Sequence, residues 1–279
     1  ARCDLTGTNH ALPQQATSGR SAVAGRVLAM VIRAVGRYGC AMLDLQSRPK
    51  CSECPIRHRA VCARCDDDEL LMLEQIKTYK SFKAGDQVLW RGDGLTYVAS
   101  VVAGVASLGK TMEDGRTQMV GLLLPSDFIG RPGREAIDFD VVAVTDVTLC
   151  CFHRKPFEAL IETTPHIAQR LMEMALDELD AARDWMLLLG RKTAREKIAT
   201  FIEMLVRRQR LTIDDATDQE LVLPLTLHEI ANYLGLTLET VSRQLGAMKK
   251  ERIVQFVDRR RFRVTDLEAL HVASGDDCL

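Results

Sequence analysis

The apolar positions of this chain change their spacing along the sequence, and each spacing predicts a different kind of element. From about residue 79 to residue 152, apolar runs alternate with turn-forming sequences such as RGDG, MEDGR and GRPGR. The runs are QVLW, YVASVVAGVASL, QMVGLLL and DVVAVTDVTLCCF. Short β-prone runs at regular spacing predict an antiparallel roll or barrel. The preceding segment DDDELLMLEQIKTYKSF begins with acidic residues and has apolar residues at helical spacing, which predicts a short helix.

A longer helical pattern follows Pro165 and has two apolar faces. The first repeats in steps of four and three residues, as in helices that pair, and includes Ala168 followed by Met172, Ala175, Leu179, Ala182, Met186 and Leu189. The second face consists of Leu171, Met174, Trp185 and Leu188. We therefore expect the second face to pack on its own domain and the six residues from Met172 to Leu189 to form a homodimer interface. A helix packed only within its own domain would show the same periodicity.

Near the carboxyl end, the sequence predicts two short helices joined by a tight turn. Thr226 and Glu229 form a capping box that opens the first helix, and Gly235 ends it. Thr237 caps a second helix over residues 238–250. This is the helix-turn-helix arrangement, whose second helix enters the major groove of DNA. The alternating sequence IVQFVDRRRFRV predicts a hairpin beside these helices, which is a wing.

The second of these helices carries side chains suited to reading DNA bases. Glu239, Ser242 and Arg243 lie at positions i, i+3 and i+4 near its start and share one face. Arginine can bind guanine bidentately, and glutamate can accept a hydrogen bond from cytosine. Thr237 and Thr240 belong to the same predicted DNA-binding set. Between residues 241 and 263 there are eight basic and two acidic residues, which favours phosphate contacts over a plain helical hairpin with solvated charges.

Composition adds limits to this interpretation. The chain has 279 residues, is 47% hydrophobic and has a formal net charge of -1, so two domains are expected and any basic surface must be local. No apolar stretch is long enough to suggest a membrane span. The enzyme motifs GxSxG, P-loop and HExxH are absent, so an enzyme is not expected. We expect the protein to be cytoplasmic, since no secretion signal is evident.

A candidate metal-binding or redox site lies in the sequence CSECPIRHRAVCARC, residues 51–65, which contains four of the nine cysteines. In the reducing cytoplasm, clustered cysteines bind metal or do redox chemistry more often than they form disulfides. Cys51, Cys54, Cys62 and Cys65 have the spacing C-x2-C-x7-C-x2-C, and two CxxC pairs can hold zinc. Thiolates also suit an iron–sulfur cluster, and free or redox-switching thiols are a third possibility.

The sequences LTLHEIANYLGLTLETVSRQLG and DWMLLLGRKTAREKIATFIEML resemble the CRP/FNR family of transcription regulators, over about residues 42–270. The cysteine-rich start is most similar to alphaproteobacterial FNR-type proteins of the FnrL kind. The resemblance implies an α+β chain with a cyclic-nucleotide-binding-like β-roll, a long dimerisation helix and a winged helix-turn-helix. It also implies that Glu239, Ser242 and Arg243 read TTGAT-type half-sites in double-stranded DNA, and that the homodimer contacts RNA polymerase; the sequence TMEDGRTQM is a guess for that contact.

The expected domain bounds follow from the same pattern. Residues 1–41 are an uncertain extension before a start expected at Met42, and residues 42–66 form the cysteine-rich segment. Residues 67–163 form the β-roll, 164–190 the dimerisation helix with a break at Gly190, and 191–279 the DNA-binding domain. A polar loop, LTIDDATDQE, is expected within this last domain.

In FNR-type sensors, three amino-terminal cysteines and a fourth from the roll hold an oxygen-labile [4Fe–4S] cluster that promotes dimerisation and DNA binding at low oxygen. The resemblance implies Cys51, Cys54, Cys62 and Cys150 as ligands here, with Cys65 and Cys151 as alternates. Strand alternation would turn Cys151 away from Cys150. A zinc site would use Cys65 and not Cys150, so the two hypotheses differ at identifiable residues.

Other regulators share this architecture and stay open as alternatives. A CRP/FNR regulator without a cluster, with structural zinc, with redox thiols or constitutively active, is the main one. A cAMP-binding regulator is not expected, because IGRPGREAIDFD supplies Arg131 and Arg134 but lacks the Gly-Glu and Arg-Ser pairs of the phosphate pocket. Haem binding could use His153 or His58, although a lone histidine beside basic residues is more often simply exposed.

Overall fold

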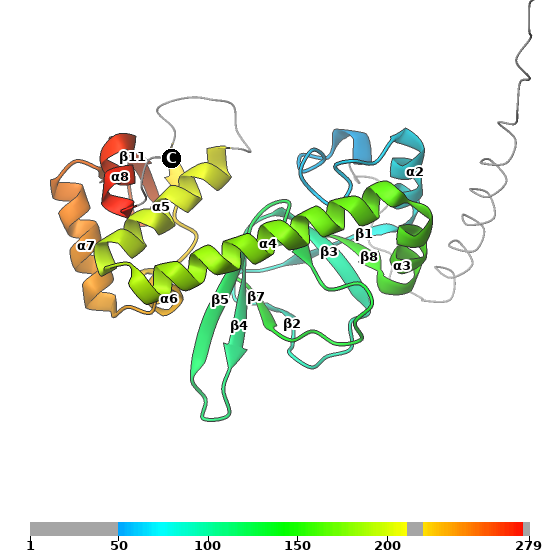
Figure 1. Cartoon of the computed structure of the whole chain (residues 1–279), viewed down its shortest axis with the longest axis horizontal. Coiled ribbons are helices and arrows are strands. Elements are labelled where there is room, and N and C mark those ends of the chain that lie inside the picture. Colours follow the sequence, from blue (N-terminus) through cyan, green and yellow to red (C-terminus); the bar gives the residue numbers. More distant parts are fainter. Residues whose placement is uncertain (1–49, 211–219, 276–279) are drawn as a thin grey trace, which may run out of the picture.

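The computed structural model describes residues 50–210 and 220–275. Figure 1 shows a β-roll with the cysteine-rich segment at one end, a helical domain at the other end, and the long helix α4 running between them. The predicted fold class is confirmed. The expected extension 1–41, the first residues of the cysteine-rich segment and nearly all of the polar loop at 211–219 lie outside the described residues.

The cysteine-rich segment is a compact run of turns. It opens with the short 3-10 helix η2 (Cys51–Glu53) and buries Ile56, Ala60 and Val61. The guanidinium of Arg57 donates hydrogen bonds to three carbonyl oxygens, those of Cys62, Ala63 and Cys65, at 2.6, 3.0 and 2.7 Å. The side chain of Arg57 therefore holds the second half of the segment in a fixed curve.

Helix α2 (Asp67–Ile76) follows at once, and its start is explained by the sequence. The Asp66 side chain accepts from the Glu69 amide, and the Glu69 side chain accepts from the Asp66 amide, which completes a capping box. Three acidic residues in the first turn favour the helix dipole. The predicted helix is confirmed but ends at Ile76, since the next residues, KTYKSF, form a strand.

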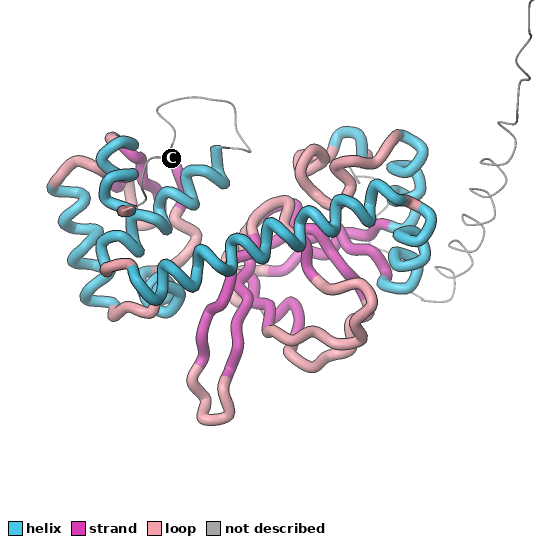
Figure 2. The backbone as a smooth tube through the Cα atoms, in the orientation of Figure 1, coloured by secondary structure: helices cyan, strands magenta, loops and turns pink. Residues whose placement is uncertain are grey.

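The β-roll consists of two four-stranded sheets in which all pairings are antiparallel. The strand orders are β1-β8-β3-β6 and β2-β7-β4-β5. The strands are β1 (Lys77–Phe82), β2 (Gln87–Leu89), β3 (Tyr97–Ala103), β4 (Ala106–Thr111), β5 (Thr117–Leu123), β6 (Phe128–Ile129), β7 (Asp140–Ala143) and β8 (Val147–His153). The hairpin β4–β5 projects from the body of the roll (Figure 2).

Two predicted runs are each two strands. YVASVVAGVASL divides into β3 and β4 at Gly104, whose φ of 85° and close approach to the Asp146 carbonyl exclude a side chain. DVVAVTDVTLCCF divides into β7 and β8 at residues 144–146. The short strand β6 was not predicted, because two residues give no periodicity.

Helix α3 (Arg154–Thr163) closes one end of the roll and supports β8. Phe157 is fully buried, and its ring stacks on those of Phe152 at 5.2 Å and Phe128 at 5.8 Å between centroids. Phe152 belongs to β8, which lies between β1 and β3. The strand that carries Cys150 and Cys151 is thus central in its sheet and packed from the end by an aromatic cluster.

Helix α4 (Pro165–Arg191) has the two faces predicted from the sequence. Leu188 is buried, while Leu171, Met174 and Trp185 are half-buried. All residues of the predicted dimer seam are exposed in the single chain, namely Met172, Ala175, Leu179, Ala182, Met186 and Leu189. The helix continues past Gly190, where a break was predicted, to Arg191, and Lys192 is its C-cap. None of the described helices is long and apolar enough to cross a membrane.

The carboxy-terminal domain is a winged helix-turn-helix. Its elements are α5 (Ala194–Arg210), β9 (Leu221–Val222), α6 (Leu227–Leu234), α7 (Leu238–Lys250), β10 (Val254–Phe256), β11 (Arg261–Val264) and α8 (Leu267–Ser274). The predicted hairpin is confirmed as β10–β11, and β9, which was not predicted, adds a third strand beside β11.

The helix-turn-helix has the caps and the turn that were predicted from the sequence. The Thr226–Glu229 capping box is complete, and Gly235 ends α6 in the left-handed region at φ 62°. The Thr237 hydroxyl accepts from the Thr240 amide at the start of α7. Several side chains between α5, α6 and α7 are almost fully buried: Ile198, Leu205, Ile230, Leu234, Val241 and Met248. The apolar faces fix the angle between the helices and leave the start of α7 outside.

Candidate metal centre and nucleic-acid interface

Six cysteines lie in the described residues, and none of them forms a disulfide. Cys51, Cys65, Cys150 and Cys151 are buried, and Cys54 and Cys62 are half-buried. Cysteine thiols buried in apolar surroundings are held in the protonated form unless a cation or a metal favours the thiolate. Four of these sulfur atoms are therefore shielded from water, and those of Cys54 and Cys62 are partly accessible.

The pKa values show which thiols lie near one another. Burial raises the pKa of Cys150 well above its usual value, and the charges of the other nearby thiols raise it further, namely Cys51, Cys151, Cys54 and Cys62. Burial likewise raises the pKa of Cys62 to about 11, with contributions from Cys51 and Cys54. Burial raises the pKa of Cys65 to about 12, with a contribution from the charge of Cys62. The thiols of Cys51, Cys54 and Cys62 are thus near enough to Cys150 for their charges to affect it, and Cys65 lies near Cys62.

The register of the sheet explains why Cys150 faces the segment. Cys150 on β8 lies opposite Tyr79 on β1 and Ser100 on β3, so these three side chains share one face of the sheet. Burial raises the pKa of Tyr79, and the nearby charges of Cys150, Cys54 and Cys51 add to the shift. Cys151 lies on the other face, near Tyr97, whose pKa is raised mainly by burial and further by the charge of Cys151. The predicted alternation of Cys150 and Cys151 agrees with these contacts.

The sulfur atoms of the described cysteines are spaced more widely than the four thiolates of one tetrahedral zinc ion. Zinc held by four thiolates at about 2.3 Å brings their sulfurs to about 3.8 Å from one another. No three sulfurs of the described cysteines lie within 4.8 Å of one another. Each thiolate of a cubane cluster binds a different iron atom, so its ligands are spread more widely. The Ser100 hydroxyl, opposite Cys150, is buried without a hydrogen-bond partner among the described residues, and a sulfur-rich group would provide an acceptor.

One further set of metal-ligand residues is explained by folding alone. The side-chain atoms of Asp66, Glu69 and His166 lie within 4.8 Å of one another. Asp66 and Glu69 form the capping box of α2, and the Glu69 carboxylate also contacts His166 Nδ1 at 2.9 Å. The group therefore joins α2 to the start of α4 and gives no indication of a metal.

Polar contacts join the cysteine-rich segment to α4, and the sequence pattern did not predict them. Arg64 pairs with Glu173 at 2.8 Å, and Arg170 donates to the Arg59 carbonyl at 2.7 Å. Arg170 also contacts Glu173 at 3.3 Å. The first two contacts join residues that are 109 and 111 positions apart in the sequence. Only the folded chain therefore shows that the segment rests on the helix that carries the predicted dimer seam.

The predicted DNA-reading residues lie on the surface of α7. Glu239, Ser242 and Arg243 are exposed near the amino end of the helix. Thr237 is exposed and Thr240 is half-buried, and their hydroxyls contact each other at 3.1 Å in the helix cap. The two threonines therefore position the start of α7, while the other three side chains are available to DNA.

Two of the eight counted basic residues are engaged by acids. Arg261 pairs with Asp258 at 2.6 Å and with Glu220 at 3.2 Å, and Arg263 pairs with Glu220 at 2.9 Å. Glu220 lies outside the stretch in which charges were counted, so sequence reasoning missed this neutralisation. Other basic side chains on and after α7 are exposed, namely Arg243, Lys249, Lys250, Arg252, Arg259 and Arg260.

The first helix of the motif is held against the roll. Met119 donates its amide to the Asn232 side chain at 2.9 Å, and Gln118 donates to the Asn232 carbonyl at 2.8 Å. Asp127, at the turn before β6, pairs with Arg208 of α5 at 3.1 Å. Trp185 of α4 stacks on Tyr233 of α6 with centroids 4.1 Å apart. The roll, the long helix and the DNA-binding domain thus meet at specific contacts.

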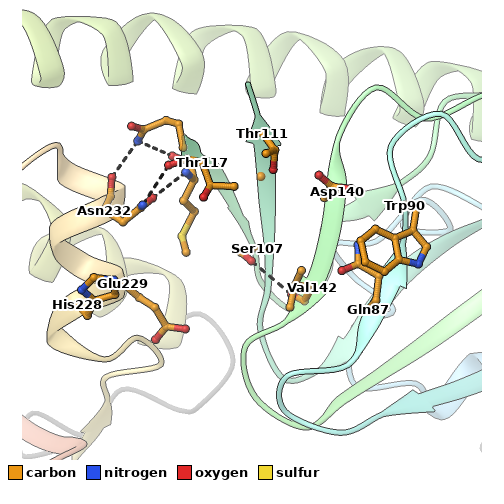
Figure 3. Close-up of a pocket in the computed structure, with 13 residues that line it drawn as sticks. Gln87, Trp90, Ser107, Thr111, Thr117, Asp140, Val142, His228, Glu229 and Asn232 are labelled. Carbon is orange, nitrogen blue, oxygen red and sulfur yellow. Dashed lines mark hydrogen bonds between the residues drawn. The ribbon is translucent and has the colours of Figure 1, made fainter. Parts of the chain in front are cut away.

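A cavity of about 350 Å³ lies between the roll and α6 (Figure 3). It is lined by residues such as Trp90, Ser107 and Val142 from the roll and by His228, Glu229 and Asn232 from α6. The Glu229 carboxylate is used by its capping box. None of the described residues that line the cavity is Arg or Lys, so it has no cation for a phosphate group. Arg131 and Arg134 are exposed on the loop after β6 and do not line it.

Known protein families match both domains of the chain. Residues 196–272 match the Crp-like helix-turn-helix domain, and residues 79–164 match the cyclic nucleotide-binding domain. The chain is 58% identical over 230 residues to the transcriptional activator protein FnrL of Cereibacter sphaeroides, which covers 82% of this chain and 93% of that protein. It is 39% identical over 207 residues to the nitrogen fixation regulation protein FixK of Bradyrhizobium diazoefficiens, which covers 74% of this chain and 86% of that protein.

A solved structure shows the same architecture. FixK2 from Bradyrhizobium japonicum superposes with a TM-score of 0.66 at 31% sequence identity. The alignment covers 73% of this chain and 100% of that one. The likeness therefore extends through the roll, the long helix and the helix-turn-helix together.

Proposed function

This chain belongs to the CRP/FNR family of transcription regulators, and from this premise we propose that it activates transcription in response to low oxygen. Its relatives are DNA-binding regulators of the FNR and FixK type and not enzymes, which fixes the general function. The proposal concerns what controls the DNA-binding domain. Four thiols from two distant parts of the chain supply the candidate sensor.

Cys51, Cys54, Cys62 and Cys150 are the proposed ligands of a [4Fe–4S] cluster. When bound, the cluster would supply an oxygen-labile bond between the cysteine-rich segment and the roll. The observation that carries the proposal is that Cys150, from the central strand β8, lies among the cysteines of a segment more than 80 residues earlier. Cys51 and Cys150 are buried and Cys54 and Cys62 are half-buried, so the surrounding protein limits the access of solvent to the proposed cluster.

The segment is well placed to influence dimer formation. Arg64 and the Arg59 carbonyl contact Glu173 and Arg170 on α4, one residue or two from Met172 at the start of the exposed seam. A change in the position of the segment would therefore alter the helix that forms the proposed homodimer. The exposed acids Asp177, Glu178 and Asp180 lie beside the seam and would add repulsion that makes pairing conditional.

Dimer formation would in turn control DNA binding. A dimer presents two α7 helices to half-sites one helical turn apart, and a monomer presents only one. Glu239, Ser242 and Arg243 are the proposed readers of TTGAT-type half-sites. Contact with RNA polymerase stays a prediction; the exposed tip of the β4–β5 hairpin, residues 112–116, remains the candidate surface.

The proposal is tested by purifying the whole protein without oxygen and measuring its absorption spectrum, iron, acid-labile sulfide and affinity for a TTGAT-type palindrome. We expect a brown protein with about four iron atoms per chain that loses both colour and DNA affinity in air. A colourless protein with one zinc per chain and the same DNA affinity in air would reject oxygen sensing. It would favour the alternative suggested by the two CxxC pairs, which is a cluster-free regulator.

A further inference from the structure

Lys77 is a buried basic residue at the edge of the cysteine site. It is the first residue of β1 and only 4% of its surface is exposed. Its Nζ atom donates a hydrogen bond to Cys51 Sγ at 3.3 Å and lies 3.5 Å from a Glu74 carboxylate oxygen. The same atom is 5.7 Å from the centroid of the Tyr79 ring. A buried ammonium group is costly unless anionic partners surround it.

Strand geometry directs Lys77 to this position. Lys77 and Tyr79 are two residues apart on β1, so they lie on the same face of the sheet. Tyr79 lies directly opposite Cys150, which places the ammonium group on the face that carries the fourth proposed ligand. Lys80 of the same strand lies on the opposite face, where its Nζ atom is 3.6 Å from the centroid of the Tyr97 ring.

We propose that Lys77 is a positioning and charge-compensating residue for the metal centre, which acts by donating a hydrogen bond to the Cys51 ligand sulfur. The proposal rests on the proposed function above, because it assumes a cluster on Cys51, Cys54, Cys62 and Cys150. Four thiolates around an inorganic core concentrate negative charge where water is excluded. Hydrogen bonds to ligand sulfurs and the local net charge set both the reduction potential and the retention of such clusters.

The Glu74 carboxylate gives the simpler explanation of Lys77, which is an ion pair within one turn. Glu74 and Lys77 are at positions i and i+3 where α2 ends and β1 begins, and the Glu74 side chain is one-third exposed. An ion pair of that kind does not require the lysine to be buried against a cysteine. The two roles predict different results when Glu74 or Lys77 is replaced separately.

The test compares anaerobically reconstituted wild-type protein with Lys77→Met, Lys77→Arg, Glu74→Gln and Lys80→Met. Three quantities are measured: iron and sulfide per chain, the rate of iron release to a ferrous chelator without oxygen, and the midpoint potential of one-electron reduction by dithionite with redox dyes. We expect Lys77→Met to release iron about tenfold faster, the size expected for loss of one charge-assisted hydrogen bond. Its potential should shift to a more negative value, because reduction adds a charge that the ammonium group stabilises.

The controls separate this role from a structural one. The midpoint potential of Lys77→Arg should lie closer to that of the wild type than the potential of Lys77→Met does. Lys80→Met should have the same potential and iron release as the wild type. Glu74→Gln should have a smaller effect than Lys77→Met, whereas an ion pair alone would make the two equal. If Lys77→Met does not fold, as judged by circular dichroism, Lys77→Gln replaces it in the comparison.

Two negative results have different meanings. Folded, iron-loaded Lys77→Met with wild-type iron release and potential would overturn the role of Lys77 and leave the proposed function standing. A wild-type protein that binds no iron on reconstitution would overturn both.

Discussion

The two functional regions of this protein are built in opposite ways. The proposed DNA-reading residues Glu239, Ser242 and Arg243 lie on the exposed face of one helix, and the caps and turn that form it are encoded between Thr226 and Lys250. The cysteine site combines a turn-rich segment with Cys150 on a central strand, and most of it is buried. One region is a local motif presented to solvent, and the other exists only after the roll has folded.

This difference in construction determines which parts of the chain each function depends on. An exposed motif tolerates change elsewhere provided that its own helices pack. A buried site assembled from distant strands depends on the packing of the whole domain, since interiors are close-packed and transmit strain. Substitutions that damage one region and spare the other therefore test the comparison directly.

The largest effect is expected from core aromatic residues, with one chosen in each domain. Phe157→Ala in the roll and Phe201→Ala in the DNA-binding domain each remove a buried ring and should cost about 3–5 kcal/mol of unfolding free energy. Only Phe157→Ala should reduce iron per chain, because Phe157 packs against β8. Urea unfolding followed by circular dichroism, with iron analysis of the folded fraction, measures both. Equal iron loss in the two variants would break the comparison.

A smaller effect is expected from Arg243→Ala on the exposed helix. Loss of a bidentate contact to guanine should weaken specific DNA binding by about 1–3 kcal/mol, roughly 5- to 150-fold. Iron content and the dimer fraction should stay at wild-type values, since Arg243 is exposed and α7 lies at the opposite end of the molecule from the cysteine-rich segment (Figure 1). Fluorescence anisotropy with a palindromic and a scrambled duplex provides the measurement. A loss that is the same for both duplexes would assign Arg243 to phosphate contact instead of base reading.

Charge reversal between the segment and α4 should have a modest effect that is confined to dimerisation. Arg64→Glu and Glu173→Arg each replace the 2.8 Å ion pair with like charges and should weaken the dimer a few-fold at low salt. The double variant should recover most of the loss. Analytical ultracentrifugation without oxygen measures the equilibrium, with iron content as a control. Absence of recovery in the double variant would show that this contact does not couple the two elements.

The smallest effect concerns the wing, where the Asp258 carboxylate organises the hairpin turn. The Arg260 amide and the Arg261 guanidinium and amide hold the pKa of Asp258 at about 2, below its ordinary value. Because the folded-state pKa is the lower one, this contribution is complete above about pH 4 and is lost as the pH falls towards 2. Carbon NMR of the carboxyl group should show the low pKa, and Asp258→Asn should have a flatter stability profile in this range. A carboxyl group that titrates near pH 4 would contradict the geometry.

The same contrast explains what the sequence could predict. The helix-turn-helix could be predicted from Thr226, Gly235 and Thr237, because helix caps and left-handed turns depend only on neighbouring residues. The burial of Lys77, the Arg64–Glu173 pair and the Asn232 contacts with β5 depend on tertiary packing, which no local period encodes. Strand ends at Gly104 and residues 144–146 were missed since continuous apolar runs hide tight turns. Cys150 entered through family resemblance, and register shows why it faces the segment.

The central claim is that one inorganic centre joins Cys150 to the amino-terminal cysteines, and iron analysis of two matched serine variants tests it most directly. Cys65→Ser and Cys150→Ser change two buried cysteines of similar exposure, one in the cysteine-rich segment and one on β8. After anaerobic reconstitution, the account predicts about four iron atoms per chain in Cys65→Ser and a large loss of iron in Cys150→Ser. Full iron loading of Cys150→Ser together with loss in Cys65→Ser would contradict it and confine the metal to the segment.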